Sequence, residues 1–184
     1  MYPFLRLYRQ VHKARRMPAL GLFDAHRSVL HCWPQDIDPW VELNNGRTLT
    51  LFDLGRVPMI TRLGLRPHLN ANGWSMAVAG ASVRYRRRVK MFDRLEMISR
   101  LAGWDDKFLY IDQSLWRAGE CTTQVLNRTA VTSGSGIIAP ERLIRSAGFT
   151  EPQPELPGWI AAWARAEAER PWPPEAGRIA GNNV

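Results

Sequence analysis

Residues 33–56 carry the strongest structural signal in the chain, and they read Trp33-Pro-Gln-Asp-Ile-Asp-Pro-Trp-Val-Glu-Leu-Asn-Asn-Gly-Arg-Thr-Leu-Thr-Leu-Phe-Asp-Leu-Gly-Arg56. The first half is a polar loop with three carboxylates, and the second half is rich in apolar residues. From residue 46 to 63, apolar side chains are spread around most of the helical circumference, which predicts a buried helix. Because an internal proline kinks or breaks a helix, we expect this one to run to about Val57, with a shorter continuation to Leu63 after Pro58.

The segments around this helix predict strands. Residues 25–33 form the first candidate, and the ranges 74–90, 94–104, 108–117 and 121–133 follow it. Short polar turns join the last four, which favours an antiparallel meander. A buried helix followed by long strands predicts an α+β fold in which a curved antiparallel sheet wraps around a long central helix.

Two further helical regions flank this core and suggest a division into residues 1–20, 21–140 and 141–184. In a helix over residues 4–16, the apolar face would hold Phe4, Leu7, Tyr8 and Val11. The opposite face is basic, a pattern typical of a helix on a membrane surface, although docking on its own domain is the interpretation we favour. Helices are also expected over 140–147 and 159–170, with a proline-rich linker at 151–157 and a frayed tail from residue 171.

Composition narrows the classes of protein that fit. The chain has 184 residues, 45% of them hydrophobic, so it can bury a sizeable core. It has no apolar run of membrane-spanning length and only two cysteines, which favours a reducing, cytoplasmic location. The net charge of +8 favours anionic partners: nucleic acid, an acidic membrane surface or a phosphate-bearing cofactor.

The loop before the helix has the residues needed for acyl-transfer chemistry. Asn44 or Asn45 is a natural N-cap. The free backbone N–H groups of the helix start favour developing negative charge, and a neighbouring loop carboxylate can act as nucleophile or general base. From spacing alone, an acidic capping loop without catalytic function remains the favoured alternative.

Residues 33–56 resemble the motif of the hotdog-fold acyl-CoA thioesterases (4-hydroxybenzoyl-CoA thioesterase-like), Asp-x-Asp-x-x-Gly-His-Val/Met-Asn-Asn followed by the central helix. They are most similar to the thioesterase superfamily member 6-like branch, and residues 83–87, 92–96 and 103–107 share that similarity. The resemblance implies a long helix wrapped by an antiparallel sheet, the hotdog fold, to which the helices expected near the two ends of the chain would be additions. It also implies homodimers or tetramers with active sites at the subunit interface, and hydrolysis of acyl thioesters. Coenzyme A or acyl carrier protein would enter as part of the substrate, with no separate cofactor.

The resemblance also assigns roles within the motif. Asp38 falls at the position of the catalytic carboxylate, and the N–H of Asn45 falls where the family polarises the thioester carbonyl. Val41-Glu42 replaces the family's Gly-His. Losing the glycine stiffens the loop, and Glu42 brings a second carboxylate that would raise the pKa of one of the pair. Either the chemistry is retuned, or the site has become a pocket that binds acyl-CoA or lipid without hydrolysing it.

Other candidates are weaker. Asp53, on the central helix, is a second catalytic candidate, although an ion pair with Arg56 is the favoured interpretation. In residues 83–90, every second residue from Arg84 to Lys90 is basic, so in a strand these side chains would lie on one face. We favour a solvent-exposed face as the explanation, followed by binding of coenzyme phosphates and then by binding of nucleic acid. The histidines lie at no metal-ligand spacing, so no metal site is expected. The predicted substrate-binding residues are Asn44, Trp40, Gly80, Arg84 and Arg86.

Overall fold

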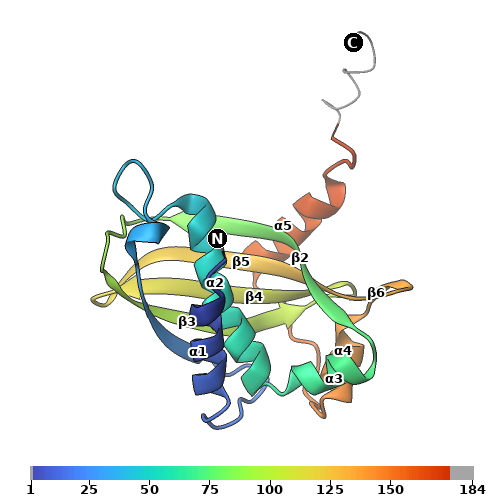
Figure 1. The fold of residues 1–184 in the computed structure, drawn as a ribbon. Helices are drawn as coiled ribbons and strands as arrows, with labels where there is room; N and C mark the ends of the chain where they lie inside the picture. Colours follow the sequence, from blue (N-terminus) through green and yellow to red (C-terminus); the bar gives the residue numbers. More distant parts are fainter. Residues whose placement is uncertain (1, 175–184) are drawn as a thin grey trace, which may run out of the picture. The chain divides into compact units, whose positions relative to one another are not determined.

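The computed structural model describes residues 2–174 and contains two compact units, divided between Pro154 and Glu155. Among its described residues, 155–174, the second unit contains one helix, α5 (Gly158–Glu169), close to the predicted range 159–170. Part of the predicted frayed tail, residues 175–184, lies outside the described residues. All the features discussed below belong to the first unit (Figure 1).

A six-stranded antiparallel sheet forms the body of this unit. Its order is β1-β3-β4-β5-β2, and β6 extends the sheet by pairing with the end of β5. The strands are β1 (His26–His31), β2 (Ser75–Tyr85), β3 (Arg94–Trp104), β4 (Phe108–Arg117), β5 (Glu120–Ser133) and β6 (Gly136–Ile138). The predicted bounds of β3 and β4 match the observed ones.

The predicted meander is correct for β3, β4 and β5 but wrong for β2. Strand β2 pairs with β5, from Ser75 opposite Thr132 to Tyr85 opposite Thr123, and not with its successor β3. The connection of residues 86–93 permits this, because extended chain at about 3.3 Å per residue can cross three strand spacings of about 4.8 Å. Strand β2 therefore forms an edge of the sheet, at the opposite side from β1 (Figure 1).

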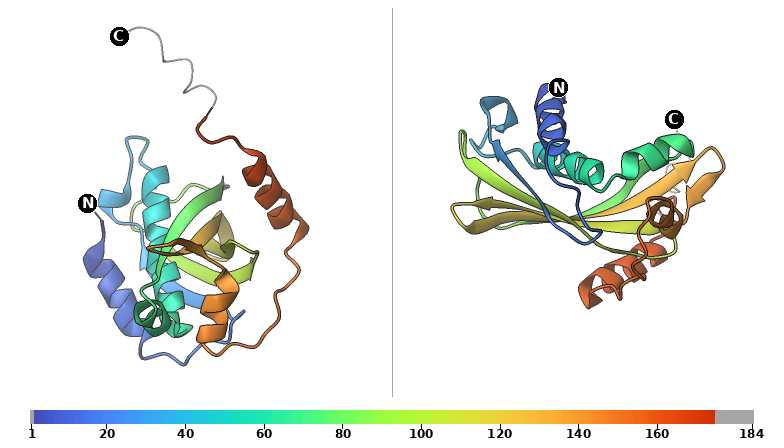
Figure 2. Two further views of the ribbon diagram at one scale, coloured as in Figure 1. Left: turned by 90° about the vertical axis from the view of Figure 1, so that its right-hand side faces the viewer. Right: turned by 90° about the horizontal axis from the view of Figure 1, so that it is seen from below.

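Helix α2 (Asn45–Arg62) lies in the concave face of the curved sheet (Figure 2). Leu51, Phe52 and Leu54 are fully buried, and a Cβ atom at Gly55 would collide with side chains of β3. The predicted continuation past Pro58 is confirmed to within one residue, since the helix ends at Arg62, but the predicted interruption at the proline is wrong, because α2 is one continuous helix. Proline removes one hydrogen bond, but burial of the surrounding helix against the sheet stabilises the helix on both sides of it.

Shorter helices complete the unit. Helix α1 (Phe4–Ala14) lies against α2, and Gln10 donates a side-chain hydrogen bond to the Val29 carbonyl at 2.9 Å. Helices α3 (Leu65–Ala71) and α4 (Pro140–Ser146) contact each other near the end of α2. The predicted helix over 140–147 is confirmed.

His26 is expected to make folding stability depend on pH. The ring is 2% exposed, and its Nδ1 lies 3.1 Å from Nη1 of Arg62. Burial, followed by the charges of Arg62 and Lys13, lowers its pKa from 6.5 to about 4. Between these values the unfolded chain binds a proton that the folded chain does not, so stability falls as the pH drops from about 6.5 to about 4, by about 3 kcal/mol in total.

Denaturant unfolding at several pH values across this range measures the effect. The control is His26→Gln, which has no titratable group and is expected to show a flatter profile between the two pKa values. Parallel profiles for the two proteins would contradict the prediction.

Candidate functional site

Asp36 connects two helices to the loop of residues 34–44 that precedes α2, the motif loop. It ends the short 3₁₀ helix η1 (Pro34–Asp36), and its carboxylate is completely buried. The carboxylate accepts hydrogen bonds from Arg6 at 2.7 Å, from Arg47 at 2.7 Å and from the backbone N–H of Trp33 at 3.0 Å. Burial raises its pKa, but the hydrogen bonds from Arg47, Trp33 and Arg6 outweigh burial and hold the pKa below its usual value. The first carboxylate of the motif is thus a structural anchor, which spacing along the chain did not reveal.

Asn44 caps α2 with its side chain. Its Oδ1 accepts a hydrogen bond from the N–H of Arg47 at 3.0 Å, while its own N–H donates to the Asp36 carbonyl at 2.9 Å. Asn45 is consequently the first helical residue, and an N–H in the first turn has no acceptor within the helix. The helix dipole adds partial positive charge at this point. The predicted N-cap is therefore confirmed at Asn44, and Asn45 begins the helix.

Residues 38–42 form a tight turn. The Asp38 carboxylate accepts a hydrogen bond from the N–H of Trp40 at 2.9 Å, and the Asp38 N–H donates to the Glu42 carbonyl at 2.8 Å. Val41 has φ of 62°, in the left-handed region that favours glycine. Val41 therefore adopts a conformation that favours glycine, at the position where the family motif has glycine.

A cavity of about 200 Å³ opens at the start of α2. Two of the predicted catalytic residues, Glu42 and Asn45, lie on its wall together, whereas Asp38 and Asp53 do not line it. The Tyr85 hydroxyl donates to the Asn45 carbonyl at 3.3 Å and joins the helix start to the end of β2. The lining residues are Glu42, Leu43, Asn45, Thr48, Tyr85, Arg86, Arg87, Arg88, Val89 and Thr123.

Three consecutive arginines converge on this cavity. The predicted alternation along residues 83–90 is wrong after Tyr85, where β2 ends. The N–H groups of Arg86 and Arg87 both donate to the Thr122 carbonyl, so the chain turns instead of alternating. Arg87 also pairs with Glu120 on β5, and Arg88 pairs with Glu42 at 3.1 Å. The turn brings all three side chains to one cavity, which a regular strand cannot do.

The remaining candidates lie elsewhere. Asp53 pairs with Arg56, as the favoured interpretation predicted, and accepts a hydrogen bond from the Tyr2 hydroxyl at 3.0 Å. Gly80 lies at a β-bulge in β2, and Arg84 lies opposite Gln124 on β5; neither lines the cavity.

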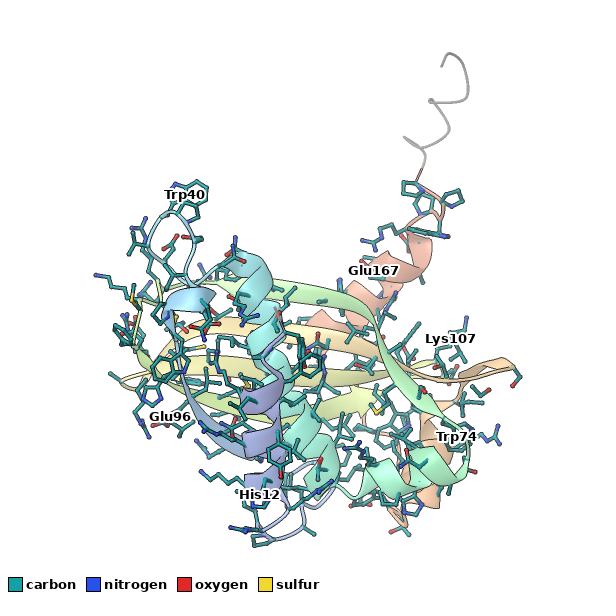
Figure 3. All side chains as sticks on the ribbon, viewed as in Figure 1. His12, Trp40, Trp74, Glu96, Lys107 and Glu167 are labelled. Carbon is teal, nitrogen blue, oxygen red and sulfur yellow. The ribbon has the colours of Figure 1, made fainter. Side chains whose placement is uncertain are left out.

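Trp40 lies at the outer tip of the motif loop, where Figure 3 shows its ring extending away from the sheet. It is 78% exposed. It borders a second hollow of about 380 Å³, which Glu42 also lines.

Two kinds of feature are absent from the described part of the chain. Among residues 2–174, no group of three or more histidine, cysteine, aspartate or glutamate side chains is arranged to hold a metal ion. No helix in the same range has the length and apolar character required to cross a membrane.

A curved antiparallel sheet around a central helix, with an acidic loop at the capped helix start, defines the hotdog-fold thioester hydrolases. Residues 32–164 match the model of the thioesterase-like superfamily, and the chain belongs to that family. It is 30% identical over 166 residues to Protein THEM6 of Xenopus laevis, covering 88% of this chain and 78% of that protein.

Solved structures show the same fold. The probable thioesterase YbaW of Escherichia coli has a TM-score of 0.62 at 17% identity, covering 66% of this chain and 95% of that one. The 1,4-dihydroxy-2-naphthoyl-CoA thioesterase Slr0204 of Synechocystis has a TM-score of 0.59 at 9% identity, covering 67% and 95%.

Proposed function

We propose that this protein hydrolyses acyl thioesters of coenzyme A or acyl carrier protein in the cavity at the start of α2. The observation that carries the proposal is the joint presence of Glu42 and the first helical residue, Asn45, on the wall of one cavity. A helix N-terminus stabilises the oxyanion that forms when a thioester carbonyl is attacked. The carboxylate supplies the base or nucleophile.

In this mechanism the N–H of Asn45 donates to the thioester oxygen. A loop carboxylate either removes a proton from the attacking water or attacks the carbonyl carbon itself. The carbon–sulfur bond then breaks, and the thiolate leaves and takes up a proton. Where the carboxylate itself has attacked, water then hydrolyses the acyl–enzyme anhydride, which releases the acid and restores the carboxylate. The family pattern gives the role of carboxylate to Asp38, whereas the cavity wall favours Glu42, so both belong in the test.

The arginines beside the cavity suit the phosphates of the substrate's carrier arm. Arg86, Arg87 and Arg88 all line it, and guanidinium groups form bidentate contacts with phosphate. Among the described residues, Arg87 and Arg88 already pair with glutamates. We therefore assign the first phosphate contact to Arg86.

The edge strand β2 supports assembly into homodimers. It has hydrogen-bonded strand neighbours on one side only, and it presents the half-exposed side chain of Val78. An exposed edge of this length invites pairing with another strand, and a second copy would supply it by twofold symmetry. In such a dimer each cavity, at the end of β2, would lie near the partner.

The test is thiol release from acyl-CoAs of graded chain length, comparing wild type with Asp38→Asn and Glu42→Gln. We expect loss of the active carboxylate to lower kcat/KM about 100-fold or more. Asp106→Asn, in the exposed turn between β3 and β4, is the matched control and is expected to keep full activity. Full activity in both Asp38→Asn and Glu42→Gln would contradict the assignment.

A second candidate function is binding of acyl-CoA or lipid without hydrolysis. The position of Asp38 favours it. The Asp38 carboxylate accepts a hydrogen bond from the N–H of Trp40 within its own turn, and Asp38 does not line the cavity. In that case wild type would release no thiol from any substrate, yet acyl-CoA would raise the melting temperature. An Arg86→Ala variant would then lose the shift.

A further inference from the structure

Two neighbouring loops present large apolar side chains to solvent. Trp40 is 78% exposed and Phe92 is 60% exposed. Contact of such large apolar surfaces with water is energetically unfavourable. We call this surface the aromatic tip; it consists of Trp33, Trp40, Val41, Met91 and Phe92. Exposed apolar patches of this kind mark interaction sites.

The two loops form one rigid platform. The N–H of Leu43 donates to the Val89 carbonyl at 2.8 Å, and the N–H of Phe92 donates to the Cys32 carbonyl at 2.7 Å. The rings of Trp33 and Phe92 meet edge to face with centroids 6.2 Å apart. The second hollow, of about 380 Å³, is bordered by Trp40, Val41 and Met91. The exposed side chains therefore lie close together on a braced scaffold.

Backbone conformation supports a functional reason for this placement. Val41 has φ of 62° and Phe92 has φ of 68°, both in the left-handed region. A β-branched or aromatic residue is strained there, whereas glycine or asparagine is tolerated. Stability alone would thus favour small or polar residues at both positions, on grounds of strain and of exposure.

The charges beside the aromatic tip indicate its partner. Arg88 and Lys90 border the same hollow as Trp40 and Met91. Arg88 pairs with Glu42, and no ion pair of Lys90 occurs among the described residues. Tryptophan beside basic residues is the composition that partitions into the interface of a bilayer with anionic headgroups.

We propose that the aromatic tip docks on an anionic lipid surface. Glu42 and Arg88 border both the second hollow and the candidate active-site cavity. Docking would therefore place the mouth of that cavity beside the membrane. An acyl thioester whose chain lies in the bilayer could then enter directly. The docking itself rests on the tip alone; only this route for substrate rests on the proposed function.

Co-sedimentation of the full chain with vesicles tests the docking. Wild type is expected to bind phosphatidylcholine vesicles that contain phosphatidylserine and not those of phosphatidylcholine alone. The double variant Trp40→Ser/Phe92→Asn is expected to bind at least tenfold more weakly, without loss of melting temperature, since asparagine tolerates the left-handed turn. Lys90→Ala is expected to weaken binding about fivefold.

The matched control is Phe4→Ser/Tyr8→Ser on α1, where both side chains are also highly exposed. It is expected to bind like wild type. Failure of wild type to bind anionic vesicles, or equal binding by wild type and the tip variant, would overturn the proposal. So would loss of binding in the α1 variant alone. A smaller oligomer in the tip variant, seen by light scattering, would instead assign the tip to contact between copies. Hydrolysis of a short, water-soluble thioester reports separately on the proposed function.

Discussion

Replacing Asp36 by asparagine is expected to lower the free energy of unfolding by about 3–5 kcal/mol, the range observed when one partner of a buried ion pair is removed. The carboxylate is fully buried, and the two side chains that bind it, those of Arg6 and Arg47, are only 16% and 15% exposed. Asparagine keeps the size of the side chain but removes the negative charge that both guanidinium groups bind. The loss reaches three elements at once, because Asp36 connects α1, the motif loop and the first turn of α2.

Denaturant unfolding at neutral pH measures this loss, with Glu120→Gln as the control. Glu120 also pairs with an arginine, but both side chains are at least half exposed, and exposed pairs contribute about 0–1 kcal/mol. Because the folded-state pKa of Asp36 is depressed, its contribution is present above about pH 4 and is lost as the pH falls through the folded value. The difference in free energy of unfolding between wild type and Asp36→Asn should therefore become smaller at acid pH. Equal losses in the two variants at neutral pH would refute the anchoring role.

Replacing Gln113 by leucine is expected to cost about 3 kcal/mol, because it leaves several buried polar groups without partners. Gln113 lies on β4 and is 1% exposed. Its Nε2 donates to the Phe52 carbonyl of α2 at 2.9 Å and to the Ser99 hydroxyl at 2.8 Å. Its Oε1 accepts from Asn127 at 3.1 Å. One side chain thus joins the central helix to three neighbouring strands.

Gln124→Leu is the matched control. Gln124 belongs to the same sheet, but among the described residues its side chain donates a hydrogen bond only to Asp112, whose side chain is partly exposed. It is expected to cost less than about 1 kcal/mol. Urea unfolding compares the two variants. Thiol release provides a second measurement, because a shift of α2 also moves Asn45 and the cavity wall. A Gln113→Leu protein as stable as the control would show that the network does not hold the helix.

Much of the fold follows from local patterns in the chain. The bounds of β3 and β4 were predicted because turn-forming residues separate runs with strand character. The buried central helix followed from its all-round apolar surface. The position of the helix start followed from the adjacent asparagines, one of which caps the helix as expected. These signals depend on residues a few positions apart, so they survive without knowledge of the rest of the molecule.

The family motif also located the candidate site, but not its internal arrangement. Spacing could not distinguish the buried anchor Asp36 from the turn residue Asp38 or from Glu42 on the cavity wall. The three carboxylates lie within seven positions of one loop. Their different environments arise from contacts with α1, with the loop itself and with the arginines after β2.

Features that depend on distant partners appeared only in the folded chain. Strand β2 pairs with β5 instead of β3, α2 passes through Pro58 without ending, and the arginine run turns toward the cavity instead of alternating. In each case tertiary packing outweighs the local rule, because burial of apolar surface and pairing of backbone groups across the sheet contribute more than the propensity of a single residue.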